Sequence, residues 1–148
     1  MKFLLRNMTE EDLGEVATLE NQLFSDAWTE EMFRSEINLH EAFIAVNPET
    51  NEILGFTCGW TILDEYSITN VGIKKSFRRR GIAFRMLKAV IEEKIKKGIK
   101  YFFLEVRESN FPAILLYEKL GFEKNGMRKN YYSSPAENAF LMSLRLLK

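Results

Sequence analysis

Hydrophobic and polar positions along this chain follow two periods, and the changes between them mark the predicted elements. Short apolar or β-branched runs predict strands, and apolar positions three and four residues apart predict helices. The expected order is β-α-α-β-β-β-α-β-α-β-β. Strands are predicted at residues 3–6, 42–46, 53–63, 68–73, 101–107, 122–127 and 140–147, with helices beginning near residues 9, 29, 83 and 110.

This order predicts the fold class. Antiparallel hairpins before and after a β-α-β crossover give an α/β protein with a mixed sheet and helices on both faces. Residues 128–138, between the last two strands, are too polar for a core and are expected to form a loop. The length suits one domain, residues 1–148, large enough for its own core.

Composition narrows the classes of partner. The 21 basic and 21 acidic residues cancel, so charge gives no reason to expect nucleic acid or membrane as a partner. No stretch is long enough to span a bilayer and no apolar signal segment begins the chain, so a cytoplasmic protein is expected. Cys58 cannot form an intramolecular disulfide. It could act as a nucleophile, but without an evident base we interpret it as a buried core thiol.

A basic turn between the 68–73 strand and the following helix is the first candidate site. It reads R-R-R-G-I-A, residues 78–83. Small residues let the backbone approach a ligand, and the first N–H groups of the helix have no partner within it. Such N–H groups beside arginines attract phosphate. The alternative is a helix start with a solvated basic collar.

A second segment follows the predicted strand Y-F-F-L-E-V-R, which carries one carboxylate, Glu105, among apolar neighbours. Ser109 or Asn110 caps the next helix, Pro112 lies in its first turn, and Gly121 ends it. Together, R-R-R-G-I-A and L-E-V-R-x-S-N-x-x-A-I-x-L-Y-E-K-L-G-F resemble the acetyl-CoA-binding core of the GCN5-related N-acetyltransferases, the GNAT superfamily. The chain is most similar to the RimI-type branch, the ribosomal-protein-alanine N-acetyltransferases, over roughly residues 62–132.

The resemblance implies a mostly antiparallel sheet whose central parallel strands splay apart and admit acetyl-CoA as co-substrate. Backbone groups of Val71, Gly72 and Ile73 would pair with its pantetheine arm. The pyrophosphate would lie on the turn and helix start, residues Arg79, Arg80, Gly81, Ile82, Ala83 and Phe84. Asn110 is expected to contact the same ligand, although a plain N-cap would also explain it.

The resemblance also implies a catalytic pair. Glu105 would be the general base, unless it is simply paired with Arg107 on the same strand face. Tyr117 would protonate or hydrogen-bond the leaving thiolate. Helical spacing places Ala113, Leu116 and Leu120 on one face, interpreted as the core stripe, and leaves Tyr117 free to point away from it. Ordinary packing is the alternative for Tyr117.

Acceptor-binding residues are implied by the same resemblance. Trp28 lies in F-S-D-A-W-T, which is similar to the family turn F-x-x-P-W-S with Ala27 in place of proline, although Trp28 could equally be packing. Glu65 is a candidate contact or a solvated turn residue. Tyr131 and Tyr132 match the R-x-x-Y-Y segment of the branch, and adjacent loop tyrosines favour ligand contact.

The resemblance implies N-α-acetylation of a protein N-terminus, most specifically the N-terminal alanine of a small-subunit ribosomal protein, S18. Alternatives are a lysine or small-amine acetyltransferase and a non-catalytic acyl-CoA-binding module. We expect no metal, no nucleic acid or membrane partner, and a monomer or weak dimer.

Overall fold

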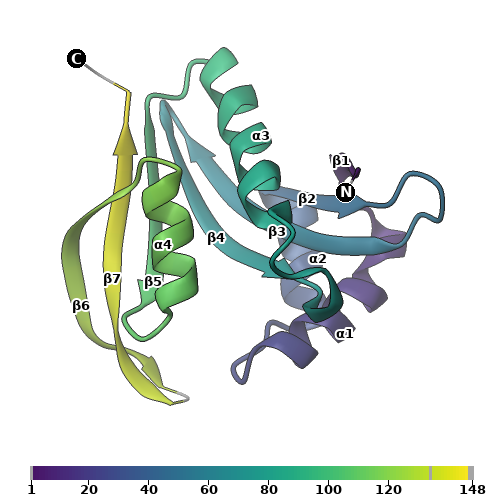
Figure 1. The fold of residues 1–148 in the computed structure, drawn as a ribbon, viewed down its shortest axis with the longest axis horizontal. Coiled ribbons are helices and arrows are strands. Elements are labelled where there is room, and N and C mark those ends of the chain that lie inside the picture. The colour runs from purple at the N-terminus through teal and green to yellow at the C-terminus, as the bar shows by residue number, and fades with distance from the viewer. Residues whose placement is uncertain (1, 134, 147–148) are drawn as a thin grey trace.

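The computed structural model describes residues 2–133 and 135–146. Their strands form one seven-stranded sheet in the order β1-β2-β3-β4-β5-β7-β6, with β4 and β5 parallel and the other neighbours antiparallel (Figure 1). The predicted order of elements and the mixed sheet are confirmed. The strands are β1 Leu4–Asn7, β2 Glu41–Val46, β3 Ile53–Ile62, β4 Glu65–Ile73, β5 Tyr101–Arg107, β6 Glu123–Ser133 and β7 Ala136–Arg145.

Helices cover both faces of the sheet (Figure 1). On one face, Val16 and Phe33 pack against Phe56 of β3; on the other, Leu87 and Ile114 join the core of β4 and β5. None of the helices in the described ranges is long and apolar enough to cross a membrane. The helices are α1 Leu13–Leu23, α2 Glu30–Leu39, α3 Ile82–Lys96 and α4 Phe111–Lys119, with 3₁₀ turns at Glu10–Asp12 and Lys75–Phe77.

The parallel pair β4–β5 opens partway along its length. Their register runs from Glu65 opposite Tyr101 to Ile68 opposite Leu104 and then stops. At the same point β3 pairs Cys58 with Asn70 and Gly59 with Ile68, which leaves Thr69 as a bulge residue in β4. A bulge bends its strand and disrupts the ladder. Beyond it, β4 and β5 diverge toward the end of the sheet where α3 and α4 begin (Figure 1).

The expectation of a loop at residues 128–138 is wrong. Residues 128–133 continue β6 and residues 136–138 begin β7, so these strands form a long hairpin. The polarity that suggested a loop has another cause, because β6 is an edge strand with almost every residue exposed. The predicted last strand is confirmed as far as Arg145, while Leu147 lies outside the described residues.

Candidate active site

The split leaves backbone groups of β4 facing the gap. Lys74 N–H donates to Leu54 O of β3 at 2.8 Å. Because backbone groups of successive strand residues point to opposite sides, Gly72 also faces β3, and the N–H and C=O of Val71 and Ile73 point toward the gap. The gap therefore offers an unpaired strand edge to an extended ligand.

Gly72 serves this edge through its lack of a side chain. A Cβ at this position would lie 2.5 Å from the Phe56 ring and 3.0 Å from Leu23 of α1. Any larger residue would clash with Phe56 of β3 and Leu23 of α1 and would displace β4. Of the three predicted β4 contacts, Val71 and Ile73 have the backbone direction for a ligand, and Gly72 allows their placement.

The turn before α3 has an unusual backbone. Arg79 and Gly81 have φ angles of 64° and 72°, in the left-handed region. Gly81 is the N-cap and supplies no side chain, and no side chain caps this helix start. The first helical hydrogen bond is donated by Arg85 N–H to Gly81 O. In the described part of the chain, the N–H groups of Ile82, Ala83 and Phe84 therefore have no side-chain cap, and such groups can bind an anion.

Between the diverging strands lies a narrow cavity of about 210 Å³. Asn110 and Tyr117 of the α4 region line it together with β4 and β5. Asn110 Oδ1 accepts a hydrogen bond from Ala113 N–H at 3.3 Å, so its capping role is real and coexists with its place beside the cavity.

Tyr117 corrects the predicted orientation of α4. Ile114 and Tyr117 form the buried face, whereas Ala113, Leu116 and Leu120 are partly buried at its side. Tyr117 points into the core, packs its ring 6.0 Å from that of Phe122, and still reaches the cavity. Burial raises the pKa of its phenol far above the ordinary value. It is therefore a protonated hydrogen-bond donor at neutral pH.

A wider groove of about 950 Å³ opens on the other side of Glu105. Trp28 forms part of its wall, and Tyr131 and Tyr132 at the end of β6 form another. Trp28, Glu105 and Tyr132 line both the groove and the narrow cavity. These three side chains therefore stand where the two spaces meet.

Glu105 is oriented by the hairpin. Arg128 Nε lies 2.9 Å from Glu105 Oε2 in an ion pair, although this buried oxygen accepts no hydrogen bond in the described residues. Burial, with the nearby Glu105 carboxylate, raises the pKa of Tyr131. The guanidinium of Arg107 instead pairs with Asp26 and Glu137, at 3.0 and 3.2 Å.

Two sequence candidates lie away from these spaces. Glu65 is exposed at the start of β4, at the paired end of the β4–β5 ladder, and does not line either space. Cys58 is fully buried, and burial raises the pKa of its thiol, which agrees with the core interpretation. Within residues 2–133 and 135–146, no group of three His, Cys, Asp or Glu side chains is placed to hold a metal ion.

The lining residues that were missed from sequence include Glu20, Glu36, Trp60 and Arg128. Glu36 on α2 is buried beside the groove and accepts a hydrogen bond from Trp60 Nε1 at 2.9 Å. Charged residues at the buried positions of α1 and α2 were the available signal, because a carboxylate facing a core needs a partner. For Arg128 the signal was its place as the arginine of the R-x-x-Y-Y segment, of which only the two tyrosines were taken as candidates.

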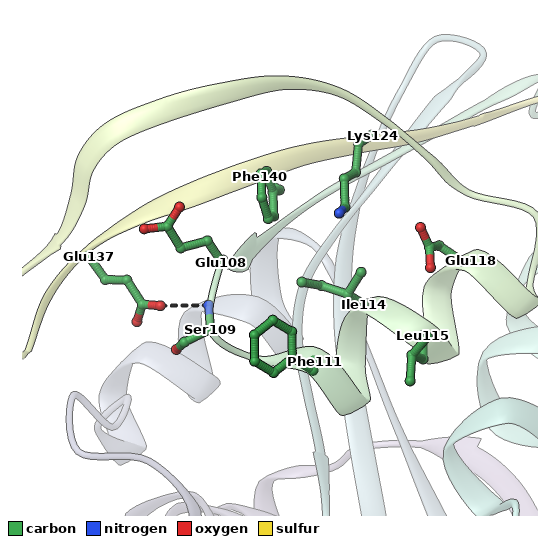
Figure 2. A pocket seen from close by; sticks show the side chains of 9 residues that line it. All are labelled: Glu108, Ser109, Phe111, Ile114, Leu115, Glu118, Lys124, Glu137 and Phe140. Atoms are coloured by element: carbon green, nitrogen blue, oxygen red, sulfur yellow. Dashed lines mark hydrogen bonds between the residues drawn. The ribbon is translucent and has the colours of Figure 1, made fainter.

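A third pocket, of about 640 Å³, lies between α4 and the β6–β7 hairpin and is separate from the site. Figure 2 shows Phe111, Ile114 and Leu115 projecting from α4 toward it. A hydrogen bond of 2.6 Å from Ser109 N–H to Glu137 Oε2 closes one side. None of the predicted site residues lines this pocket.

An unpaired strand edge, an uncapped helix start and a second groove meeting at a carboxylate define a class of protein that holds an extended anionic ligand beside a second substrate. Residues 13–122 match the model of the Acetyltransferase (GNAT) family. The chain belongs to this family and is an acetyl-CoA-dependent N-acetyltransferase.

Named relatives are similar over nearly the whole chain. A putative [ribosomal protein bS18]-alanine N-acetyltransferase of Bacillus subtilis is 32% identical over 95% of this chain and 94% of its own. The [ribosomal protein bS18]-alanine N-acetyltransferase of Escherichia coli is 32% identical over 90% of each chain. The crystal structure of the Escherichia coli ribosomal-protein-S18-alanine N-acetyltransferase superposes with a TM-score of 0.89 at 29% identity, covering 99% of this chain and 96% of that one.

Proposed function

We propose that this protein acts in the cytoplasm and acetylates the α-amino group of a protein N-terminus, specifically the N-terminal alanine of ribosomal protein bS18. The observation that supports this most strongly is the position of Glu105, which lines both the narrow cavity and the wide groove. The relatives named as alanine N-acetyltransferases, matched over at least nine tenths of each chain, support the choice of acceptor.

Acetyl-CoA supplies the activated acetyl thioester when bound. The N–H and C=O groups of Val71 and Ile73 would pair with the amides of its pantetheine arm, as an added strand would. The free N–H groups at the start of α3 would receive the pyrophosphate, with charge from Arg79 and Arg80. Asn110, at the other wall of the cavity, would contact the same arm.

Glu105 is the proposed general base. An amine attacks a thioester only when neutral, so a proton must leave it before or during attack. The Glu105 carboxylate stands between the two spaces and can take this proton directly or through one water. Its ion pair with Arg128 holds the carboxylate toward the β6–β7 hairpin, where Oε2 is buried although the Arg128 side chain is 59% exposed.

Tyr117 is the proposed acid for the leaving sulfur. A phenol is protonated at neutral pH at its ordinary pKa of about 10, and burial raises the pKa of Tyr117 further. It lines the cavity that would enclose the thioester arm. A hydrogen bond from this phenol to the departing thiolate would lower the barrier to its release.

The acceptor groove suits an N-terminal amine. An α-amino group has a reference pKa near 8, whereas deprotonating lysine to the same extent costs about 3 kcal/mol more. The groove lining carries one guanidinium, Arg128, and two carboxylates, Glu36 and Glu105. Trp28, Tyr131 and Tyr132 would surround the first residues of the acceptor.

The proposal is tested with two peptides and acetyl-CoA. One begins with a free alanine and follows the bS18 N-terminus; the other is N-terminally blocked and contains lysine. Mass spectrometry locates the added acetyl group, and the expected product is acetyl on the alanine nitrogen alone. Modification of the blocked peptide would replace the proposal by lysine acetylation. Modification of neither peptide, with acetyl-CoA still bound, would overturn it in favour of a small-amine acceptor or a binding module.

A further inference from the structure

A carboxylate in the core-facing stripe of α1 has no role in the chemistry proposed above. Glu20 is 2% exposed and shares the buried face of α1 with Val16 and Leu19. A leucine or methionine would fill such a position without the cost of burying a charge. Unlike a leucine or methionine, Glu20 has two carboxylate oxygens that can accept hydrogen bonds.

The two oxygens of Glu20 join separate parts of the site. Oε2 accepts a hydrogen bond from the backbone N–H of Trp28, in the α1–α2 loop, at 2.9 Å. Oε1 accepts one from Asn70 Nδ2, in β4, also at 2.9 Å. One side chain thus ties the loop to the strand across the face of the sheet.

Both partners stand at positions that shape the split. Asn70 follows the bulge residue Thr69 and precedes Val71, whose backbone faces the gap. Trp28 lines both the narrow cavity and the acceptor groove, and its ring packs 5.2 Å from that of Phe33. Glu20 itself lines the cavity. If the hydrogen bonds of Glu20 changed, Trp28, which stands between the two substrates, would move relative to β4. This strand is proposed to bind acetyl-CoA.

We propose that Glu20 is a positioning residue that fixes the spacing between the α1–α2 loop and the split half of β4, and thereby places Trp28 where acceptor and thioester meet. This inference rests on the proposed function. Glu20 touches neither reacting atom, so its effect on the reaction passes through Trp28 and Asn70.

The chemistry of the tie suggests an exchange test. In Glu20→Gln, the single carbonyl oxygen can serve Trp28 N–H or Asn70 Nδ2, and the new amide group faces the other donor. In Glu20→Gln/Asn70→Asp, the glutamine carbonyl can accept from Trp28 while its amide donates to Asp. The exchange keeps the net charge of the wild type. Glu15→Gln, at an exposed position on the same helix, is the matched control.

The first readout is kinetic. At a temperature well below unfolding of every variant, Glu20→Gln should lower kcat/KM for the alanine peptide about tenfold, the effect of one lost hydrogen bond to a charged group. The KM for acetyl-CoA should change less than threefold. The double variant should recover most of the loss, and Glu15→Gln should match the wild type.

The second readout needs no activity. The chain has two tryptophans, so 5-fluorotryptophan labelling gives two ¹⁹F resonances, assigned with Trp60→Phe. Glu20→Gln should shift or broaden the Trp28 resonance and leave that of Trp60 in place, and the double variant should restore it. An unmoved Trp28 resonance, or a double variant as impaired as the single one, would overturn the inference. A wild type that fails to acetylate the alanine peptide would instead refute the proposed function, and the resonances would still test the tie.

Discussion

The narrow cavity and the wide groove meet at Glu105, yet they are built from different chemical groups. The cavity presents main-chain N–H and C=O groups of β4 together with side chains from α1, the α1–α2 loop and α4. The groove presents side chains from α2, the α1–α2 loop and the β6–β7 hairpin. Main-chain N–H and C=O groups are the same in nearly every residue, so a binding surface made of them survives many substitutions. A surface made of side chains changes with each substitution. Under the proposed function, we expect substitutions around the cavity to affect acetyl-CoA binding and substitutions in the groove to affect the choice of acceptor.

The largest expected effect is at the boundary between the two spaces. Glu105→Gln should lower kcat by a factor of about 10² to 10⁴, the usual contribution of a positioned general base. Because the groups proposed to pair with acetyl-CoA are the main-chain groups of Val71 and Ile73 and not the Glu105 carboxylate, acetyl-CoA affinity measured by calorimetry should stay within a few-fold of wild type. A near-normal kcat would show that Glu105 is not the general base. The reaction would then not depend on the carboxylate at which the two spaces meet.

Tyr117→Phe should have the next largest effect. Removing the phenol while keeping the ring should lower kcat by about tenfold or more, and the KM for acetyl-CoA should rise far less. Since burial raises the pKa of Tyr117, the wild-type rate profile should show no titration of this group between about pH 6 and 9. Steady-state kinetics across this range checks both points, and an unchanged kcat would exclude the acid role.

The turn before α3 tests the proposed pyrophosphate contact at Gly81. Its φ of 72° is costly for a β-branched residue, and apart from its chain neighbours no atom of the described residues lies within 4 Å of a Cβ there, so any effect is conformational. Gly81→Val should lower the free energy of unfolding by about 1–2 kcal/mol and raise the KM for acetyl-CoA. Gly81→Asn, which tolerates this conformation, should do both to a smaller degree. Equal effects in urea unfolding and kinetics would argue against a conformational cause.

The groove should show the opposite pattern. Glu36→Gln keeps an oxygen to accept from Trp60 and removes the charge. The KM for the acceptor peptide should rise about fivefold, which corresponds to roughly 1 kcal/mol, while the KM for acetyl-CoA stays constant. A change in the KM for acetyl-CoA alone would contradict the assignment of the groove to the acceptor and of the cavity to acetyl-CoA.

The smallest expected effect is the pH dependence of stability that comes from Glu20, the residue that joins the two regions. Burial raises the pKa of its carboxyl, although hydrogen bonds from Trp28 and Asn70 oppose this. The folded state therefore holds this proton to higher pH than the unfolded chain, and stability from Glu20 is lost as pH rises from near 4.5 through the raised value. The stability difference between wild type and Glu20→Gln, followed by urea unfolding, should shrink across this window. A difference that grows with pH would contradict the direction of the shift.

The sequence predicted the cavity better than the groove for a physical reason. Gly81, the helix cap at Asn110 and the strand around Val71 are local features, and local features leave local patterns. Glu36, Trp60 and Arg128 come together only when α2, β3 and β6 are folded against one another. The hairpin was misread because an edge strand exposed on both faces has the polarity of a loop. The face of α4 was misassigned because nearly every side of that helix is apolar.

The central claim is that both substrates are bound together and that acetyl passes directly between them at Glu105. Initial rates measured while both acetyl-CoA and the alanine peptide are varied test it most directly. The account predicts intersecting double-reciprocal lines, because the one cysteine is buried and the transfer needs both substrates present. Parallel lines, with acetyl retained on the protein after acetyl-CoA alone, would show a covalent intermediate and contradict direct transfer.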